Sequence, residues 1–129
     1  MALKVIATSS APAAIGTYSQ AVATQRAITV YLSGQIPLDA ETMDLVSDDF
    51  TAQAHQVFVN LTEVAKAAGG SLADCVKLNV YLTDLANFPA LNSVMAEYIT
   101  EPFPARAAVE VSALPRGAKI EIDAVMSLE

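Results

Sequence analysis

Apolar residues recur at two spacings along the chain, and each spacing predicts a different secondary structure. Ile28, Val30 and Leu32 alternate with more polar neighbours, which is the period of a strand whose two faces differ. A short connection that includes Gln25 and Arg26 joins this strand to an earlier one, so the two strands are expected to form a β-hairpin. The strands predicted along the chain span residues 5–6, 18–23, 27–33, 76–82, 105–111 and 119–126.

Two other segments carry apolar residues three and four positions apart, which predicts helices. The first helix follows Asp48 or Asp49, either of which can accept the free backbone N–H groups of a helix start. Its apolar stripe covers residues 54–68 and stops at Gly69–Gly70, a typical left-handed helix end.

A second helix is expected to begin at Asp84 or Asn87, with Pro89 in its first turn. Its apolar stripe covers residues 88–99. Pro102 prevents the helix from continuing, because proline has no backbone N–H to donate.

The order of these elements predicts a single α+β domain over residues 1–129, with one mixed β-sheet and both helices packed on one face. The other face lacks a cover and is not strongly charged along residues 28–33 or 76–82. Hydrophobic residues make up 53% of the chain and charged residues 16%, which is more apolar surface than a small domain can hide. Such a face predicts self-association.

The bulk chemistry of the chain argues against several functions. A net charge of −7 disfavours nucleic acid as a partner, since an acidic chain repels a polyanion. One cysteine, Cys75, permits no disulfide within the chain, and one His beside it offers little for a zinc site. No glycine-rich phosphate loop is present either, which gives no sign of a nucleotide site. No stretch approaches the roughly 20 apolar residues that span a bilayer, so a soluble cytoplasmic protein without membrane partners is expected.

Arg106 and Glu121 are the charged residues whose surroundings favour binding chemistry. Arg106 follows two prolines and is flanked by small alanines, so its guanidinium has room for a two-pronged contact with a carboxylate. The alternative is a surface ion pair with an acid such as Glu110. Glu121 alternates onto the polar face of the last strand, where it is either simply solvated or shares the uncovered face with Arg106 and orients a water.

Other polar residues give weaker signals. Tyr18 and Ser33 carry hydroxyls on neighbouring predicted strands and either bind a ligand or satisfy local backbone groups. Asn92 lies off the apolar stripe of its helix and is expected to be exposed, and His55 is expected to face solvent. Cys75 is expected to be a small buried residue without a partner that would make it a nucleophile.

Four motifs built from these residues resemble the Rid (reactive intermediate deaminase) family. They are APAAIGTYSQA at residues 11–21, SGQIP at 33–37, FPARAAVEV at 103–111 and KIEIDA at 119–124. The similarity runs from about residue 5 to residue 126, which is nearly the whole chain.

The resemblance implies a chorismate-mutase-like α+β fold and a homotrimer with clefts between its subunits. It also implies hydrolytic deamination of 2-imino acids such as 2-iminopropanoate and 2-iminobutanoate. These form from 2-aminoacrylate and 2-aminocrotonate, which pyridoxal-phosphate enzymes release. The products are 2-keto acids and ammonia, and the resemblance implies no cofactor and no metal.

The resemblance also assigns residues. Arg106 matches the arginine that binds the substrate carboxylate, and Glu121 matches the acid that positions the attacking water. Further residues that match the lining of the family's cleft are Tyr18, Ser33, Gly34 through its amide, and Asn92. Many relatives carry Cys two positions after the arginine, whereas this chain has Ala108, which excludes a thiol nucleophile there.

Three other functions stay open on the sequence. One is a deaminase for a larger or aromatic imino acid. Another is a non-catalytic small-ligand-binding or chaperone-like trimer, against which the presence of Arg106 weighs. The third is an endoribonuclease or translation inhibitor, against which the negative charge and the lack of a basic patch with aromatic residues weigh.

Overall fold

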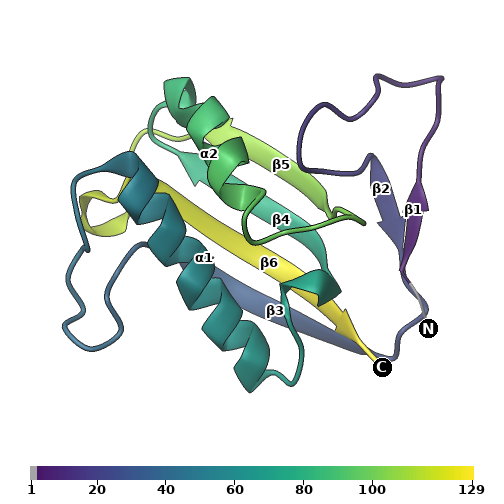
Figure 1. The fold of residues 1–129 in the computed structure, drawn as a ribbon, viewed down its shortest axis with the longest axis horizontal. Coiled ribbons are helices and arrows are strands. Elements are labelled where there is room, and N and C mark those ends of the chain that lie inside the picture. The colour runs from purple at the N-terminus through teal and green to yellow at the C-terminus, as the bar shows by residue number, and fades with distance from the viewer. Residues whose placement is uncertain (1–2) are drawn as a thin grey trace.

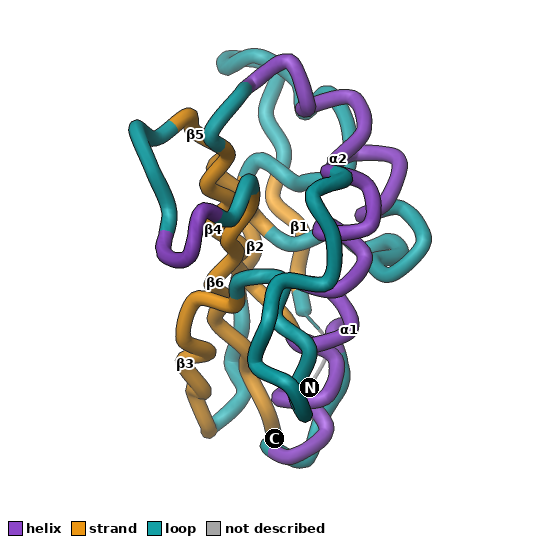
Figure 2. Tube along the Cα trace, turned by 90° about the vertical axis from the view of Figure 1, so that its left-hand side faces the viewer, coloured by secondary structure: helices purple, strands orange, loops and turns teal. Residues whose placement is uncertain are grey.

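A four-stranded mixed β-sheet forms the centre of the computed structural model, which describes residues 3–129 (Figure 1). β6 runs antiparallel to β3 and β4, whereas β4 and β5 are parallel. Helices α1 (Phe50–Ala67) and α2 (Phe88–Met95) both cover one face of this sheet (Figure 2), which confirms the predicted α+β class. In the sheet order, the strands are β3 Ile28–Gln35, β6 Ile120–Leu128, β4 Cys75–Leu82 and β5 Ala105–Glu110.

The first predicted helix is confirmed as α1, and side chains at its boundaries explain its ends. Asp49, rather than Asp48, is the cap, because its carboxylate accepts a hydrogen bond from the backbone N–H of Ala52 at 2.9 Å. After the helix the chain turns at Gly69, whose φ of +93° is a conformation that residues with a Cβ rarely adopt. Of the helices in residues 3–129, none combines the length and apolar character required to cross a membrane.

The second helix begins as predicted but ends early. Asp84 caps a single 3₁₀ turn, Leu85–Asn87, and α2 follows directly with Pro89 in its first turn. After Met95 the chain continues as hydrogen-bonded turns, in which the N–H of Ile99 donates to the Met95 carbonyl at 2.8 Å. Ile99 is buried, so the predicted apolar stripe is packed to its end even though the regular helix stops before it.

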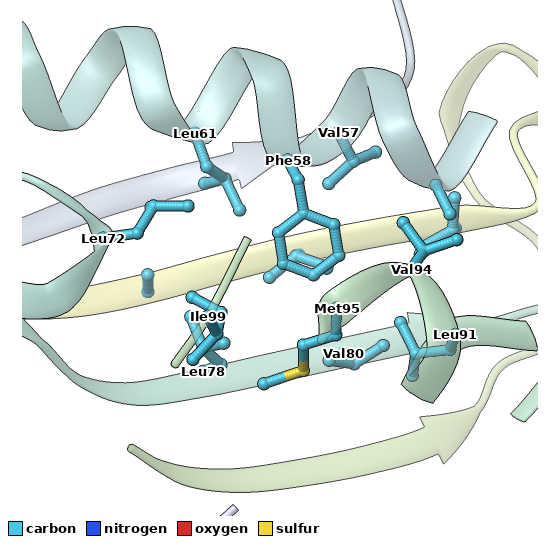
Figure 3. Close-up of a cluster of buried hydrophobic side chains, with 14 of the residues drawn as sticks. Val57, Phe58, Leu61, Leu72, Leu78, Val80, Leu91, Val94, Met95 and Ile99 are labelled. Carbon is cyan, nitrogen blue, oxygen red and sulfur yellow. The ribbon is translucent and has the colours of Figure 1, made fainter. Parts of the chain in front are cut away.

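The hydrophobic core lies between the two helices and the sheet (Figure 3). Phe58 and Leu61 of α1 meet Leu78 of β4 and Met95 of α2, and none of these four side chains is exposed. Side chains alternate along β6, so Ile120 and Ile122 point into this core while Glu121 and Asp123 point to the other face of the sheet. Burying each large apolar side chain stabilises the fold by about 1.5–3 kcal/mol.

The predicted hairpin between residues 18–23 and 27–33 is wrong. β2 (Ala21–Ala23) pairs antiparallel with β1 (Lys4–Ile6) in a separate two-stranded sheet, and β3 pairs with β6 alone among the described strands. The expectation of a single sheet is corrected in the same way, because the chain forms one four-stranded and one two-stranded sheet.

Anchors on both sides of β2 explain why it does not fold back onto β3. Before β2, the backbone N–H of Ser19 donates to the Pro104 carbonyl at 2.9 Å, which fastens the chain beside the start of β5. After β2, the Thr24 hydroxyl is hydrogen-bonded to that of Ser127 at 2.8 Å. Both anchors join positions more than 80 residues apart (about 85 and 103), so local spacing in the sequence carries no sign of them.

Replacing Phe58 by Ala should lower the free energy of unfolding by about 3–5 kcal/mol, because the substitution opens a cavity in the middle of the core. Val59 is the neighbouring position on α1 and is 41% exposed, so Val59→Ala is the matched control and should change stability by less than about 0.5–1 kcal/mol. Urea denaturation measures both. Equal losses in the two variants would contradict the assigned orientation of α1.

Candidate functional site

Arg106 lies on β5 beneath α2, on the helix-covered side of the sheet. β5 pairs with β4 so that Arg106 stands opposite Leu78, a core residue, and both side chains point to the face on which the helices pack. Glu121 stands opposite Tyr81, three positions further along β4, and points to the uncovered face. The expectation that Arg106 and Glu121 share one face is therefore wrong. Their partners on β4 are an odd number of residues apart, so the two side chains point to opposite faces of the sheet.

The guanidinium of Arg106 is held through one of its nitrogens. Nη1 donates to Asn92 Oδ1 at 2.7 Å and to Thr17 Oγ1 at 2.9 Å, and Met95 Sδ lies 3.5 Å away. Nε and Nη2 form no hydrogen bond with any residue that the structure describes. The edge that carries Nε and Nη2 is thus free for a ligand with two parallel acceptors, such as a carboxylate.

Two aromatic rings complete the surroundings of this guanidinium. Its Cζ lies 4.9 Å from the centroid of the Tyr18 ring and 5.2 Å from that of the Phe88 ring, within the range of cation–π attraction. The Tyr18 hydroxyl accepts a hydrogen bond from the backbone N–H of Ile15 at 3.1 Å, which fixes the ring. The residues gathered around Arg106 form what we call the Arg106 cluster: Thr17, Tyr18, Phe88, Asn92 and Met95.

The charge of Arg106 has no acidic partner in residues 3–129. No carboxylate forms an ion pair with it, and the alternative partner considered from the sequence, Glu110, instead accepts a hydrogen bond from the backbone N–H of Leu85 at 3.0 Å. Partial burial lowers the pKa of Arg106 from its ordinary value, and Tyr18 opposes this shift. An arginine nevertheless stays protonated, so the cluster holds a half-buried positive charge without a counter-charge.

A second cluster lies at a β-bulge in β3. The register of β3 against β6 shifts between Leu32 and Gln35, so that Ser33 and Gly34 together oppose a single residue of β6. The Glu121 side chain lies directly against Gly34, where a Cβ would overlap its carboxylate oxygen Oε2. Ser33, Gly34 and Glu121 form what we call the Glu121 cluster, and the absence of a side chain at residue 34 is what makes room for the acid.

A polar network that the sequence did not predict lies beside this cluster on the uncovered face. The Asp123 carboxylate accepts hydrogen bonds from Asn79 Nδ2 at 2.7 Å and from the Tyr81 hydroxyl at 2.9 Å. The hydrogen bond to Asp123, followed by burial and by charge repulsion, raises the pKa of Tyr81. Tyr81 therefore stays a protonated donor around neutral pH, and it stands across the strand from Glu121.

Two cavities of the described chain each touch one cluster. A cavity of about 570 Å³ beside Tyr18 is lined mainly by residues 5–9, 13–14 and 101–103, and Arg106 is not among its lining residues. A second cavity, of about 420 Å³, touches Gly34 but not Glu121. The two charged residues, Arg106 and Glu121, therefore line neither of these two cavities.

The structure brings the sequence-predicted residues together in two groups. Tyr18 and Asn92 join Arg106, and Ser33 and Gly34 join Glu121. Asn92 was expected to be exposed on its helix in the absence of the resemblance, and its contact with Arg106 corrects this. The residues that the sequence analysis missed are Thr17, Phe88 and Met95.

Signals for these missed residues were weak. Thr17 stood inside the first motif, but nothing in its spacing connects it with positions 92 and 106. Phe88 and Met95 were assigned to the apolar stripe of α2, and Met95 does pack in the core. A residue that serves both the core and a site cannot be separated from an ordinary core residue by periodicity.

Cys75 and His55 do not take part in either cluster. Cys75 is buried as expected, and burial, with a smaller contribution from the charge of Asp74, raises the pKa of its thiol to about 12. His55 Nδ1 lies 2.9 Å from the Tyr98 hydroxyl, so it is more constrained than the expected solvent-facing residue. Within residues 3–129, no three or more His, Cys, Asp or Glu side chains gather into a group that could hold a metal ion.

Known proteins are similar to nearly the whole chain. The family model described as endoribonuclease L-PSP matches residues 8–127. Protein DfrA of Myxococcus xanthus is 50% identical over 125 residues, covering 97% of this chain and 95% of that protein. The 2-iminobutanoate/2-iminopropanoate deaminase of Homo sapiens is 46% identical over 122 residues, covering 95% of this chain and 88% of the enzyme. The crystal structure of RidA from Psychrobacter sp. PAMC 21119 has a TM-score of 0.76 at 53% identity, covering 97% of this chain and 99% of that one.

Cys75 should resist alkylation in the folded protein. With a thiol pKa of about 12, almost none of it is thiolate at about pH 8, and the side chain is only 2% exposed. We expect iodoacetamide to modify Cys75 only after denaturation, as followed by mass spectrometry. Rapid modification of the native protein would show that the thiol is accessible and reactive.

Proposed function

Because this chain belongs to the endoribonuclease L-PSP family, the Rid family that its motifs resemble, we propose that it hydrolyses 2-imino acids to 2-keto acids and ammonia. The substrates are 2-iminopropanoate and 2-iminobutanoate, which form from 2-aminoacrylate and 2-aminocrotonate. The observation that carries this proposal is the half-buried Arg106, which has a free two-donor edge and no acidic partner among the described residues. The name of the human relative, a 2-iminobutanoate/2-iminopropanoate deaminase, supports the choice of substrate.

Arg106 binds the substrate through its carboxylate. A charged guanidinium that has lost water and has gained only neutral partners is stabilised when an anion arrives. The Nε–Nη2 edge offers two parallel donors, which match the two oxygens of a planar carboxylate. Because the imine carbon C2 is bonded directly to that carboxylate, this contact also places the reacting atom.

The active site requires a second copy of the chain. Arg106 and Glu121 point to opposite faces of one sheet, so the two side chains of one copy cannot reach a substrate of a few atoms from both sides. The uncovered face carries large exposed side chains, including Tyr31 at 79% and Val109 at 45% exposure, which favours an interface. We infer a homotrimer in which each cleft joins the Arg106 cluster of one copy to the Glu121 cluster of the next.

Glu121 activates the water in this scheme. Its carboxylate accepts a proton from water as the oxygen adds to C2 of the protonated imine, which gives a tetrahedral amino alcohol. The proton held by Glu121 then passes to the amino group. As ammonia leaves, the C2 hydroxyl returns a proton to Glu121 and the C2 carbonyl of the keto acid forms. Ammonia takes up this last proton, which leaves Glu121 ionised for the next turnover. Ser33 precedes Gly34 at the bulge, and we infer that its hydroxyl and the Gly34 amide hydrogen-bond the reacting groups. Positioning and one acid–base group supply roughly 10²–10⁴-fold, or about 3–5 kcal/mol.

A non-catalytic ligand-binding trimer is the second candidate. The Arg106 cluster alone is sufficient to bind a carboxylate, and the relative with 50% identity is named DfrA rather than as a deaminase. Turnover distinguishes the two functions, because binding without turnover would saturate at one ligand per cleft. The proposed substrates are released by enzymes of amino-acid metabolism, so we propose that the protein acts beside those enzymes in the cytoplasm.

Arg106→Lys should reduce kcat/KM for 2-iminobutanoate by about 10–100-fold, because lysine keeps the charge but loses the two-donor fork. A threonine dehydratase generates the imine in situ, and semicarbazide traps what the protein does not hydrolyse. Arg116→Lys is the matched control, because the Arg116 side chain is 52% exposed and forms its ion pair with Asp44, which belongs to neither cluster. Undiminished turnover by Arg106→Lys would contradict the proposed role of Arg106. Absence of turnover in the unmodified protein would contradict the proposed function itself.

Gly34→Ala should reduce turnover by displacing the Glu121 carboxylate, which a Cβ at this position would overlap. Combining it with Glu121→Gln should add little further loss, since both changes remove the same acid. The same trapping assay on the two single variants and the double variant measures this coupling. Losses that multiply in the double variant would indicate that Gly34 acts independently of Glu121.

A further inference from the structure

Thr17 occupies the centre of the Arg106 cluster, although no motif assigned it a role. It is 8% exposed, and its hydroxyl lies 2.9 Å from Arg106 Nη1 and 3.2 Å from Asn92 Oδ1. Asn92 Oδ1 in turn lies 2.7 Å from the same Nη1. The three atoms therefore form a closed triangle of hydrogen bonds.

The direction of each hydrogen bond in this triangle follows from the atoms. Nη1 carries only hydrogens to donate, so both the Thr17 hydroxyl oxygen and Asn92 Oδ1 must accept from it. The hydroxyl hydrogen of Thr17 is then left for Asn92 Oδ1, whose two lone pairs accept from both neighbours. The two hydrogens of Nη1 are shared among Thr17 Oγ1, Asn92 Oδ1 and Met95 Sδ, whereas the hydrogens of Nε and Nη2 remain available to a ligand.

The backbone around Thr17 is fixed on both sides. Gly16 has a φ of +108°, which is reserved almost entirely for glycine, and a Cβ built there would lie 3.5 Å from Asn92 Oδ1. Two residues after Thr17, the Ser19 hydroxyl donates to the Phe103 carbonyl at 2.6 Å. The Thr17 hydroxyl is thus held beside Arg106 by the short segment of residues 16–19, which Ser19 anchors to Phe103.

We propose that Thr17 is a positioning residue that sets the rotation of the Arg106 guanidinium and so presents the Nε–Nη2 edge to the substrate carboxylate. This inference rests on the proposed function for its consequence in catalysis, but its structural content is independent of it. Without the hydroxyl, Nη1 loses one of its acceptors and Asn92 Oδ1 loses one of its two donors. The guanidinium is then held by fewer partners, so for part of the time it leaves the orientation that presents the two-donor edge.

Valine and serine at residue 17 separate the hydroxyl from the shape of the side chain. Thr17→Val keeps the branched volume and removes the hydroxyl, whereas Thr17→Ser keeps the hydroxyl. We expect Thr17→Val to lower kcat/KM for 2-iminobutanoate by about 10-fold, mostly through KM, and Thr17→Ser to stay within about threefold of the unmodified protein.

A second readout follows the guanidinium itself. In heteronuclear NMR of the arginine side chains, the Nη1 hydrogens of Arg106 should give separate, slowly exchanging signals, assigned by their absence in Arg106→Lys. These signals should persist in Thr17→Ser and collapse in Thr17→Val. A Thr17→Val protein with unmodified NMR signals and unmodified kcat/KM would overturn the proposal. If the unmodified protein hydrolyses no imino acid, the proposed function fails, and the NMR comparison still decides the role of Thr17.

Discussion

The site depends on the unbalanced charge of Arg106. A guanidinium that is half buried loses part of its hydration, and in this protein it receives neutral oxygen atoms and aromatic rings in return, rather than a carboxylate from residues 3–129. Neutral partners orient the group without cancelling its charge. An acidic partner within the chain would have stabilised the free protein and weakened its grip on an anion. Under the proposed function, this arrangement gives a small acidic protein, which repels anions at long range, one local site that attracts a carboxylate.

The face of the sheet to which each charged side chain points bears on how copies of the chain could associate. The core requires Leu78 of β4 and Ile122 of β6 to point toward the helices. Arg106 pairs with Leu78 and therefore points to the same side, whereas Glu121 is the neighbour of Ile122 on β6 and therefore points to the other. Moving either residue to the opposite face would need a one-residue slip that also exposes the core. The fold therefore keeps the two charged groups apart within a copy, which is why we propose that they meet only when a second copy associates through the uncovered face.

Much of this could be predicted from residue spacing, for identifiable reasons. The packed faces of α1, β4 and β6 follow directly from the periodicity of residues such as Phe58, Leu78 and Ile122, because packing imposes that periodicity. The position of β2 could not be predicted, because the anchors at Ser19 and Thr24 are formed with residues distant in the sequence. The resemblance named Arg106, Glu121 and their neighbours but not Thr17, whose hydrogen bonds exist only once the first motif packs on α2.

The central claim is that two copies of the chain build one site, and mixing inactive variants tests it most directly. Arg106→Ala and Glu121→Gln are each expected to be inactive, and they are dissociated, mixed in equal amounts and reassembled. In randomly mixed trimers, roughly a quarter of the clefts should combine an intact Arg106 from one copy with an intact Glu121 from its neighbour. Turnover should therefore return to about that fraction of the unmodified protein. If native mass spectrometry shows mixed trimers and no activity returns, the two residues do not act in a shared cleft.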